Sequence, residues 1–296
     1  MRRHKKLFHM ENPQLIMLGT GNAVVTRCYN TCFILKDRGS MLLVDAGGGN
    51  GILQQLEKAG IRLGDIHDMF ITHAHTDHIL GAVWVTRVIM QEILKGKYSG
   101  VFNIYGHDKS IKVLSEICRM TLHKKYSECI GKTVLMHEVH DGERFQAGAF
   151  PMECFDVKST KEKQFGFRTA LSDGQSIVCL GDEPFNEQNI SYVENADWLM
   201  CEAFCLYDDR ETFKPYEKNH STALDTGIIA ERLHVRNLVL YHTEDTCLQE
   251  RKKRYGNEAR RNFSGTVHVP DDLETIPLHA TRQPGDNTAG SIAFLN

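Results

Sequence analysis

Residues 73–78 read His-Ala-His-Thr-Asp-His, which places three imidazoles and one carboxylate within six positions. Imidazole nitrogen and carboxylate oxygen are the ligands that borderline divalent ions such as Zn²⁺ prefer. The segment follows an apolar, strand-like run and precedes a helix-like stretch, so it should form a turn. In such a turn His73 and His75 can face one ion, and Asp77 and His78 can face a second. We therefore predict two adjacent metal sites. The alternative is a polar strand-to-helix loop in which Asp77 caps the helix.

This arrangement resembles the HxHxDH signature of the metallo-β-lactamase superfamily. In that superfamily a third His, a bridging Asp and a last His come from well-separated strand ends. Gly181-Asp182 follows the apolar run 176–180, and His242 follows the run 237–240, so these residues match the bridging Asp and the last His. The resemblance implies an α/β fold of the metallo-β-lactamase αββα sandwich type. The metal ligands that it implies are His73, His75, Asp77, His78, Asp182 and His242.

Within the superfamily the chain is most similar to the ribonuclease Z branch. The stretches that carry this similarity are residues 18–23 with 30–31, residues 43–47, and residues 201–204 paired with 219–223. In that branch a Glu orients a His that stabilises charge on the scissile phosphate, and the resemblance assigns these catalytic roles to Glu202 and His220. It also assigns proton acceptance to Asp77. Without the family, Ser221 would be a helix N-cap and Glu202 a carboxylate on a buried strand.

The chain departs from the family at the third ligand, where Lys158 stands at the position of the expected His. An ammonium group has donors and no lone pair, so it cannot bind a metal ion. We expect a first site that is weak or empty, a Lys158 that is deprotonated or carbamylated, or a Lys158 that supplies positive charge in place of an ion. A different register, with His137 or His140 as ligand, is a further alternative, although residues 141–142 predict a tight turn between two strands.

A second departure concerns the substrate. Members that process tRNA carry a long basic arm, which in the bacterial form is inserted between the third ligand and the bridging Asp. Here only residues 159–181 fill that interval, and a strand pair uses nearly all of them. The net charge is −3, whereas tight binders of a phosphate backbone usually have a basic domain or stripe. The short basic stretches at 2–6, 123–125 and 251–254 are typical of solvated faces or tails. We do not expect tight tRNA binding.

These observations predict a metal-dependent hydrolase, namely a phosphodiesterase of the ribonuclease Z-like type that uses metal-activated water. The cofactor would be Zn²⁺, with Mn²⁺ as an alternative, at one or two ions per chain. Two other functions stay open. One is hydrolysis of another small ester, such as a cyclic nucleotide, a phosphonate or a sulfate ester. The other, prompted by Lys158, is a metal-depleted, non-catalytic homologue. The resemblance also implies a homodimer.

Length and composition favour one large domain. With 296 residues, 41% of them hydrophobic, the chain can bury a substantial core. We predict a hydrolase domain over 1–278 and a C-terminal tail or edge element over 279–296. Nine cysteines without a CxxC pair indicate reduced, mostly buried thiols in a cytoplasmic protein. The apolar run 15–18 is too short for a signal peptide or a membrane span, so no membrane partner is expected.

Hydrophobic periodicity predicts two β-rich halves with outer helices, which describes an αββα sandwich. The predicted strands are 14–18, 32–35, 41–44, 69–72, 134–139, 152–157, 166–171, 177–180, 198–202 and the run 237–240, and the predicted helices are 52–59, 77–95, 110–122, 222–233 and 247–255.

Overall fold

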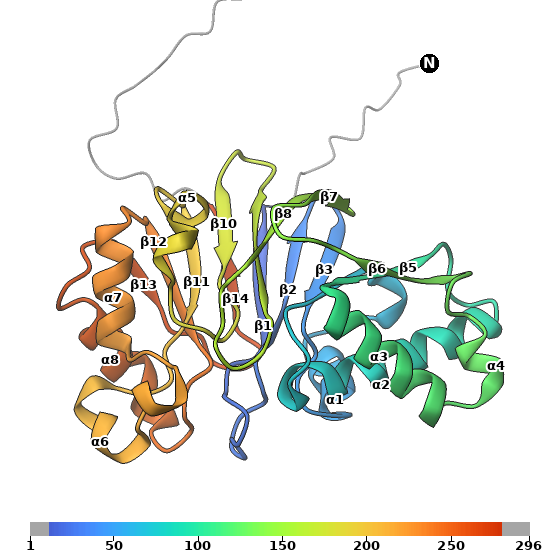
Figure 1. Cartoon of the computed structure of the whole chain (residues 1–296), viewed down its shortest axis with the longest axis horizontal. Helices are drawn as coiled ribbons and strands as arrows, with labels where there is room; N and C mark the ends of the chain where they lie inside the picture. Colours follow the sequence, from blue (N-terminus) through green and yellow to red (C-terminus); the bar gives the residue numbers. More distant parts are fainter. Residues whose placement is uncertain (1–11, 280–296) are drawn as a thin grey trace, which may run out of the picture.

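The apolar runs of the two halves of the chain form two seven-stranded sheets that face each other, with helices on the outer sides (Figure 1). The structure is a computed structural model, and it describes residues 12–279. The predicted basic stretch 2–6 and all of the predicted tail except His279 lie outside the described residues. The αββα sandwich expected from the sequence is confirmed.

The first sheet has the strand order β14-β1-β2-β3-β4-β5-β6. Its strands are β1 (Gln14–Gly19), β2 (Cys32–Asp37), β3 (Ser40–Val44), β4 (Asp68–Ile71), β5 (Phe102–Gly106), β6 (Val134–Glu138) and β14 (Thr275–Pro277). Strands β1 to β3 pair antiparallel, whereas β3 to β6 pair parallel. Strand β14 returns from the end of the described chain to pair with β1.

The second sheet has the strand order β13-β12-β11-β10-β9-β8-β7. Its strands are β7 (Arg144–Ala147), β8 (Phe150–Asp156), β9 (Phe165–Ala170), β10 (Ser176–Cys179), β11 (Trp198–Glu202), β12 (Asn237–Tyr241) and β13 (Thr266–His268). Strands β10 to β13 pair parallel, and β7 to β10 pair antiparallel. The predicted turn at 141–142 is confirmed, but it leads from β6 in the first sheet to β7 in the second.

Helices cover both outer faces. Those of the first half are α1 (Gly51–Lys58), α2 (Thr76–Leu94), α3 (Asp108–Thr121) and α4 (Lys124–Ser127), and those of the second half are α5 (Ile190–Val193), α6 (Arg210–Phe213), α7 (Ala223–Arg232) and α8 (Leu248–Ala259). Short 3-10 turns lie at Leu63–Asp65, Glu187–Asn189, Tyr207–Asp209 and Tyr216–Lys218. No helix in the described part of the chain is long and apolar enough to cross a membrane.

Strand β1 shows why the sheets are buried on both faces. Leu15 and Met17 belong to the core between the two sheets, whereas Ile16 and Leu18 belong to the core under α1 and α2. Successive side chains of a strand point to opposite faces, so a continuous apolar run fills two cores at once. A third core lies between the second sheet and helices α7 and α8. The packing of these layers determines where the strands end, and the predicted metal ligands lie just after the ends of three strands.

The predicted strands and helices are present, and their bounds agree closely except that α8 continues to Ala259. Strands β5, β7, β13 and β14 were not predicted. Three of these four are only three or four residues long, and two of them, β13 and β14, pair with a strand remote in sequence. Seven of the nine cysteines are buried, as expected, while Cys28 and Cys247 are partly exposed.

Candidate metal centre

The six predicted ligands lie at the ends of three strands that come from both sheets. His73 and His75 occupy the loop after β4, and Asp77 and His78 begin α2. Asp182 follows β10 and His242 follows β12 in the opposite sheet. Five of the six are buried, and only His75 is partly exposed. The fold therefore brings all six residues together.

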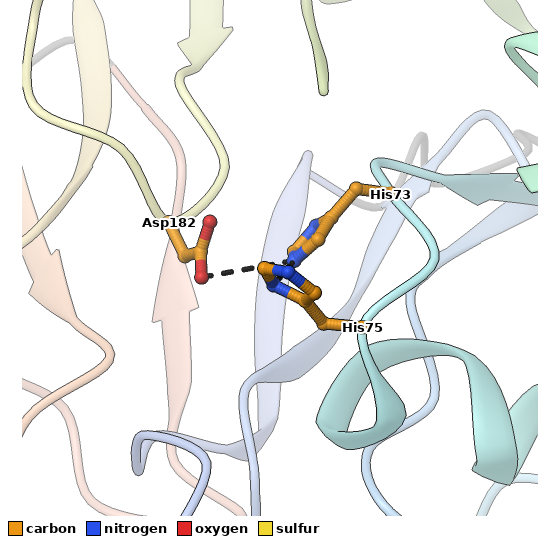
Figure 2. Close-up of side chains that lie close together, drawn as sticks. All are labelled: His73, His75 and Asp182. Atoms are coloured by element: carbon orange, nitrogen blue, oxygen red, sulfur yellow. Dashed lines mark hydrogen bonds and ion pairs between the residues drawn. The ribbon is translucent and has the colours of Figure 1, made fainter. Parts of the chain in front are cut away.

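We call the first cluster the loop group; it consists of His73, His75 and Asp182. His73 Nε2 lies 2.9 Å from His75 Nδ1 and 3.7 Å from Asp182 Oδ2. Figure 2 shows the Asp182 carboxylate facing the two imidazoles across the gap between the chain segments that carry them. One ligand atom from each residue lies within 4.8 Å of the others, which is the spacing that a single ion requires.

We call the second cluster the helix group; it consists of Asp77, His78 and His242. Asp77 Oδ2 lies 3.3 Å from His78 Nε2 and 3.6 Å from His242 Nε2. Asp182 Oδ2 also lies 3.9 Å from His78 Nε2 and 3.7 Å from His242 Nε2. The same Asp182 oxygen thus faces ligands of both groups, which is the arrangement expected of a bridging carboxylate.

Orphaned nitrogen atoms show that these residues fit a divalent ion. Nε2 of His78 and both ring nitrogens of His242 are buried and have no hydrogen-bond partner among the described residues. A buried polar atom without a partner is costly, and clusters of such atoms are rare in native proteins. A metal ion held between His78, His242 and Asp77 would supply the missing partner, so the prediction of a divalent metal site is confirmed at this level.

Asp45 holds the ring of His78 in place from behind. Its Oδ2 lies 2.7 Å from His78 Nδ1, and the carboxylate accepts hydrogen bonds from the backbone and hydroxyl of Thr72 at 2.9 and 2.7 Å. A carboxylate on one ring nitrogen fixes the tautomer and turns the other nitrogen toward a metal. Asp45 adopts a φ of 52°, which is uncommon outside glycine. Asp45 lies in the stretch 43–47 that resembles the ribonuclease Z branch, but the sequence alone assigns it no role.

The pKa values of His73 in the loop group and His78 in the helix group are shifted in opposite directions. Burial holds the pKa of His73 well below its ordinary value, so this ring is neutral and ready to bind. Burial would lower the pKa of His78, but Asp77 and Asp45 outweigh it and raise that pKa. Metal ligands must be deprotonated, so an ion in the helix group would displace a proton.

The structure does not bring Lys158 to either group. Its ammonium forms ion pairs with Asp141 at 2.9 Å and Asp156 at 3.6 Å, and these carboxylates raise its pKa, so it stays protonated. Lys158 has a φ of 63°, and this left-handed conformation turns the chain at the end of β8. Lys158 therefore contacts neither ligand group, although it lines a second cavity that His220 also borders. His137 and His140, the alternatives, belong to no candidate metal cluster of the described residues.

Gln164, which the sequence analysis missed, lies where Lys158 was expected. Its amide nitrogen donates to Asp182 Oδ1 at 2.6 Å and lies 2.8 Å from His73 Nδ1. Its Oε1 is buried and unpartnered. The side chain reaches the loop group because Gln164 sits directly before β9, next to Thr72 at the end of β4. A glutamine before a Gly-aromatic strand gives no metal signal in a sequence, so only the structure reveals it.

His220 lies beside both groups and is supported by two neighbours. Its Nδ1 is 3.6 Å from Glu202 Oε2, and its ring stacks on Phe204 with centroids 4.6 Å apart and planes 4° apart. The other oxygen of Glu202 accepts from the backbone and hydroxyl of Ser221 at 2.5 and 2.7 Å. Glu202 thus faces His220 without a hydrogen bond to it, and its orienting role stays a prediction. Ser221 is not the helix cap; Thr222 caps α7 through a capping box.

His220, Phe204 and four of the six predicted ligands line a cavity of about 400 Å³. Its walls are Asn22, Ala23, Val24, His75, Asp77, Lys161, Asp182, Phe204, Lys218, His220 and His242. Two lysines therefore share the cavity with the ligand groups, and neither was singled out from the sequence. A cavity that combines convergent polar groups and a metal centre is the usual form of a small-molecule active site.

The fold and the site together define a hydrolase of the metallo-β-lactamase fold. Ribonuclease Z of Thermobifida fusca is 26% identical over 94% of this chain and 99% of its own length. The metallo-β-lactamase fold protein YhfI of Bacillus subtilis superposes with a TM-score of 0.73 at 19% identity, covering 90% of this chain and 99% of its own. Human tRNase Z, short form, gives a TM-score of 0.69 at 20% identity, covering 90% and 100%.

Residues 13–263 match the family model described as Anti-Pycsar protein Apyc1, and the chain belongs to this family. The expectation of a ribonuclease Z-like, metal-dependent hydrolase of the phosphodiesterase type is confirmed.

Proposed function

We propose that this protein hydrolyses small phosphodiesters, of about the size of a nucleotide, and that tRNA is not its substrate. The observation that carries the proposal is the placement of both ligand groups, their shared Asp182 and His220 around one cavity of about 400 Å³. The comparisons favour a phosphodiester over a phosphonate or a sulfate ester and over a metal-depleted homologue. A cyclic nucleotide is a phosphodiester of suitable size.

The cofactor we propose is Zn²⁺, with Mn²⁺ as an alternative, at one or two ions per chain. Four imidazoles and two carboxylates form the donor set, and this mixture suits a borderline divalent ion. When bound, such ions would lower the pKa of a water molecule and polarise a phosphoryl oxygen.

The protein residues have three further roles in this proposal. Asp77 accepts a proton at its carboxylate. His220 Nε2 contacts a phosphoryl oxygen and stabilises its charge, and Glu202 keeps the ring in place through the contact with Nδ1. Phe204 covers one face of the His220 ring, so the ring is held by packing as well as by charge. Charge-stabilising groups held in advance in this way are usually worth a large share of catalysis.

Features of the chain outside the site support a small substrate. The interval 159–181 holds a short loop, strands β9 and β10 and the turn between them, with no inserted arm. The basic stretch 251–254 is largely neutralised: Arg251 is buried on Thr20, Thr243 and Pro270, while Lys252 and Arg254 pair with acidic residues. Few cations are left there to neutralise the phosphates of an RNA.

The test compares substrates on the protein loaded with Zn²⁺ or Mn²⁺. We expect hydrolysis of a bis-aryl phosphodiester and of a cyclic nucleotide, and no tight tRNA binding in a titration at about 150 mM salt, where surface charges are well screened. Sub-micromolar tRNA affinity with efficient 3′-trailer cleavage would contradict the proposal. It would indicate that another surface, such as the one around residues 124–125, replaces the arm.

We also propose, from the family resemblance, that the protein is a cytoplasmic homodimer. Light scattering on the purified protein should give twice the mass of one 33.6 kDa chain. A monomer at micromolar concentration would contradict the proposed dimer. It would not contradict the proposed hydrolysis of small phosphodiesters.

A further inference from the structure

Lys161 enters the cavity from the loop between β8 and β9. Its Nζ lies 2.9 Å from Glu183 Oε1, 3.4 Å from His220 Nε2 and 3.4 Å from the carbonyl oxygen of Asn219. The side chain is 22% exposed, so the ammonium is accessible from the cavity that it lines. Lys161 therefore links one wall of the site to the residue that we assign to the phosphate.

Glu183 offers a structural explanation for Lys161. This carboxylate is buried and accepts from the hydroxyl of Ser159 at 2.8 Å in addition to the lysine. A buried carboxylate needs a partner, and removal of that partner is costly. A lysine that served only to neutralise Glu183 would not have to lie beside His220 Nε2. Glu202 contacts the other ring nitrogen, Nδ1, so Nε2 is the nitrogen that is open to the substrate.

The distance between Lys161 and His220 decides what can bind between them. Their nitrogen atoms are 3.4 Å apart, so an oxygen at hydrogen-bond distance from His220 Nε2, about 2.7–3.2 Å, can also lie within reach of Lys161 Nζ. We infer that Lys161 is a substrate-binding residue that donates to the same phosphoryl oxygen as His220. The inference rests on the function proposed above. It assigns to Lys161 the recognition of the negative charge of the phosphodiester.

An ammonium suits this role because it is a compact charge with three donors that can rotate. One donor stays on Glu183, which holds the side chain in place, and another can turn to the substrate oxygen. Hydrogen bonds between charged partners are roughly twice as strong as neutral ones, so loss of Lys161 should weaken substrate binding clearly.

The experiment uses four variants and two measurements. Lys161→Met removes the charge, Lys161→Arg keeps it, and Lys161→Met with Glu183→Gln removes the ion pair as a whole. Lys163→Met is the matched control, because Lys163 is on the same loop but pairs with Asp108 and does not line the cavity. The measurements are kcat and KM on a bis-aryl phosphodiester and calorimetric binding of inorganic phosphate to the metal-loaded protein, with metal content and Tm recorded for each variant.

For Lys161→Met we expect KM and the Kd for phosphate to rise about tenfold or more, while metal content is unchanged and Lys163→Met resembles the wild type. Lys161→Arg should recover most of the loss. The double variant should recover Tm but keep the raised KM, because its Glu183→Gln change removes the buried charge and does not replace the substrate contact.

A double variant with wild-type KM and phosphate affinity would overturn the inference, since Lys161 would then serve only to neutralise Glu183. A Lys161→Met variant indistinguishable from Lys163→Met would overturn it as well. Phosphate binding needs no turnover, so a wild-type protein that binds phosphate through Lys161 without hydrolysing the diester would refute the proposed function and leave the inference standing.

Discussion

The loop group and the helix group come from one short motif, yet they differ in what stands behind their ligands. In the helix group His78 is held by the Asp45 carboxylate, and His242 offers two buried, unpartnered nitrogens. In the loop group His75 is partly exposed, and the remaining contacts of His73 come from an amide and a hydroxyl. The comparison shows that neighbouring side chains of the same kind can receive different support from the rest of the chain.

We expect the helix group to hold its ion more tightly for this reason. The ammonium of Lys158 pairs with Asp141, and the amide of Gln164 is the group that lies beside His73 in the loop group. An amide is a weaker partner for a borderline ion than a third imidazole would be. The following predictions test this comparison, from the largest expected effect to the smallest.

Replacement of the groups that act on the substrate should have the largest effect. Asp77→Ala and His220→Ala should each lower hydrolysis of a bis-aryl phosphodiester by about 10²-fold or more, because each removes an acid-base or charge-stabilising group. Asp77→Ala should also remove the ion of the helix group, while His220→Ala should leave metal content unchanged. Loss of metal from His220→Ala would make His220 a ligand, consistent with its closeness to Asp182 and His242.

The two groups can be separated by removal of one imidazole from each. After dialysis, elemental analysis of the wild type should find nearer one tightly held ion than two. We expect His242→Ala to lose that ion and His75→Ala to retain it, because only His242 belongs to the helix group. Two equally tight ions in the wild type would contradict the comparison.

Loss of the Asp45 contact that holds His78 in place should lower metal affinity less than loss of a ligand. Asp45→Asn should lower the metal affinity of the helix group by about 10–100-fold, since outer partners of ligating histidines usually contribute that much. Competition with a metal indicator measures the affinity. Asp141→Asn is the control, because Asp141 is an acidic residue that pairs with Lys158 and not with any ligand. Equal affinities in the two variants would show that Asp45 does not tune the site.

Gln164→Leu should have the smallest effect and should act on the other group. Its amide contacts His73 and Asp182, so its removal frees the ring and should weaken the loop group by about tenfold or less. The same indicator titration, with the helix group already filled, isolates this step. A rise in loop-group affinity would mean that the amide blocks the ion in the wild type.

The sequence by itself determined the layers and most of the metal centre. Apolar runs such as 14–18 predict strands buried on both faces, and the spacing within 73–78 places two ligands in a loop and two in the first turn of α2. Asp182 and His242 each follow a recognisable apolar strand, but only the resemblance to the metallo-β-lactamase superfamily assigned them as ligands. These signals are local, since they depend on residues close together in the chain.

Only the tertiary structure decided which side chains face the site from the loop between β8 and β9. The sequence predicted Lys158, but a positive φ there turns its side chain to Asp141, and the loop instead delivers Lys161 to the cavity and Gln164 to the loop group. The direction of a side chain in an irregular loop depends on backbone dihedrals and on partners remote in sequence, and no periodicity encodes it. Asp45 went without a role for the same reason, because its partner His78 lies 33 positions away.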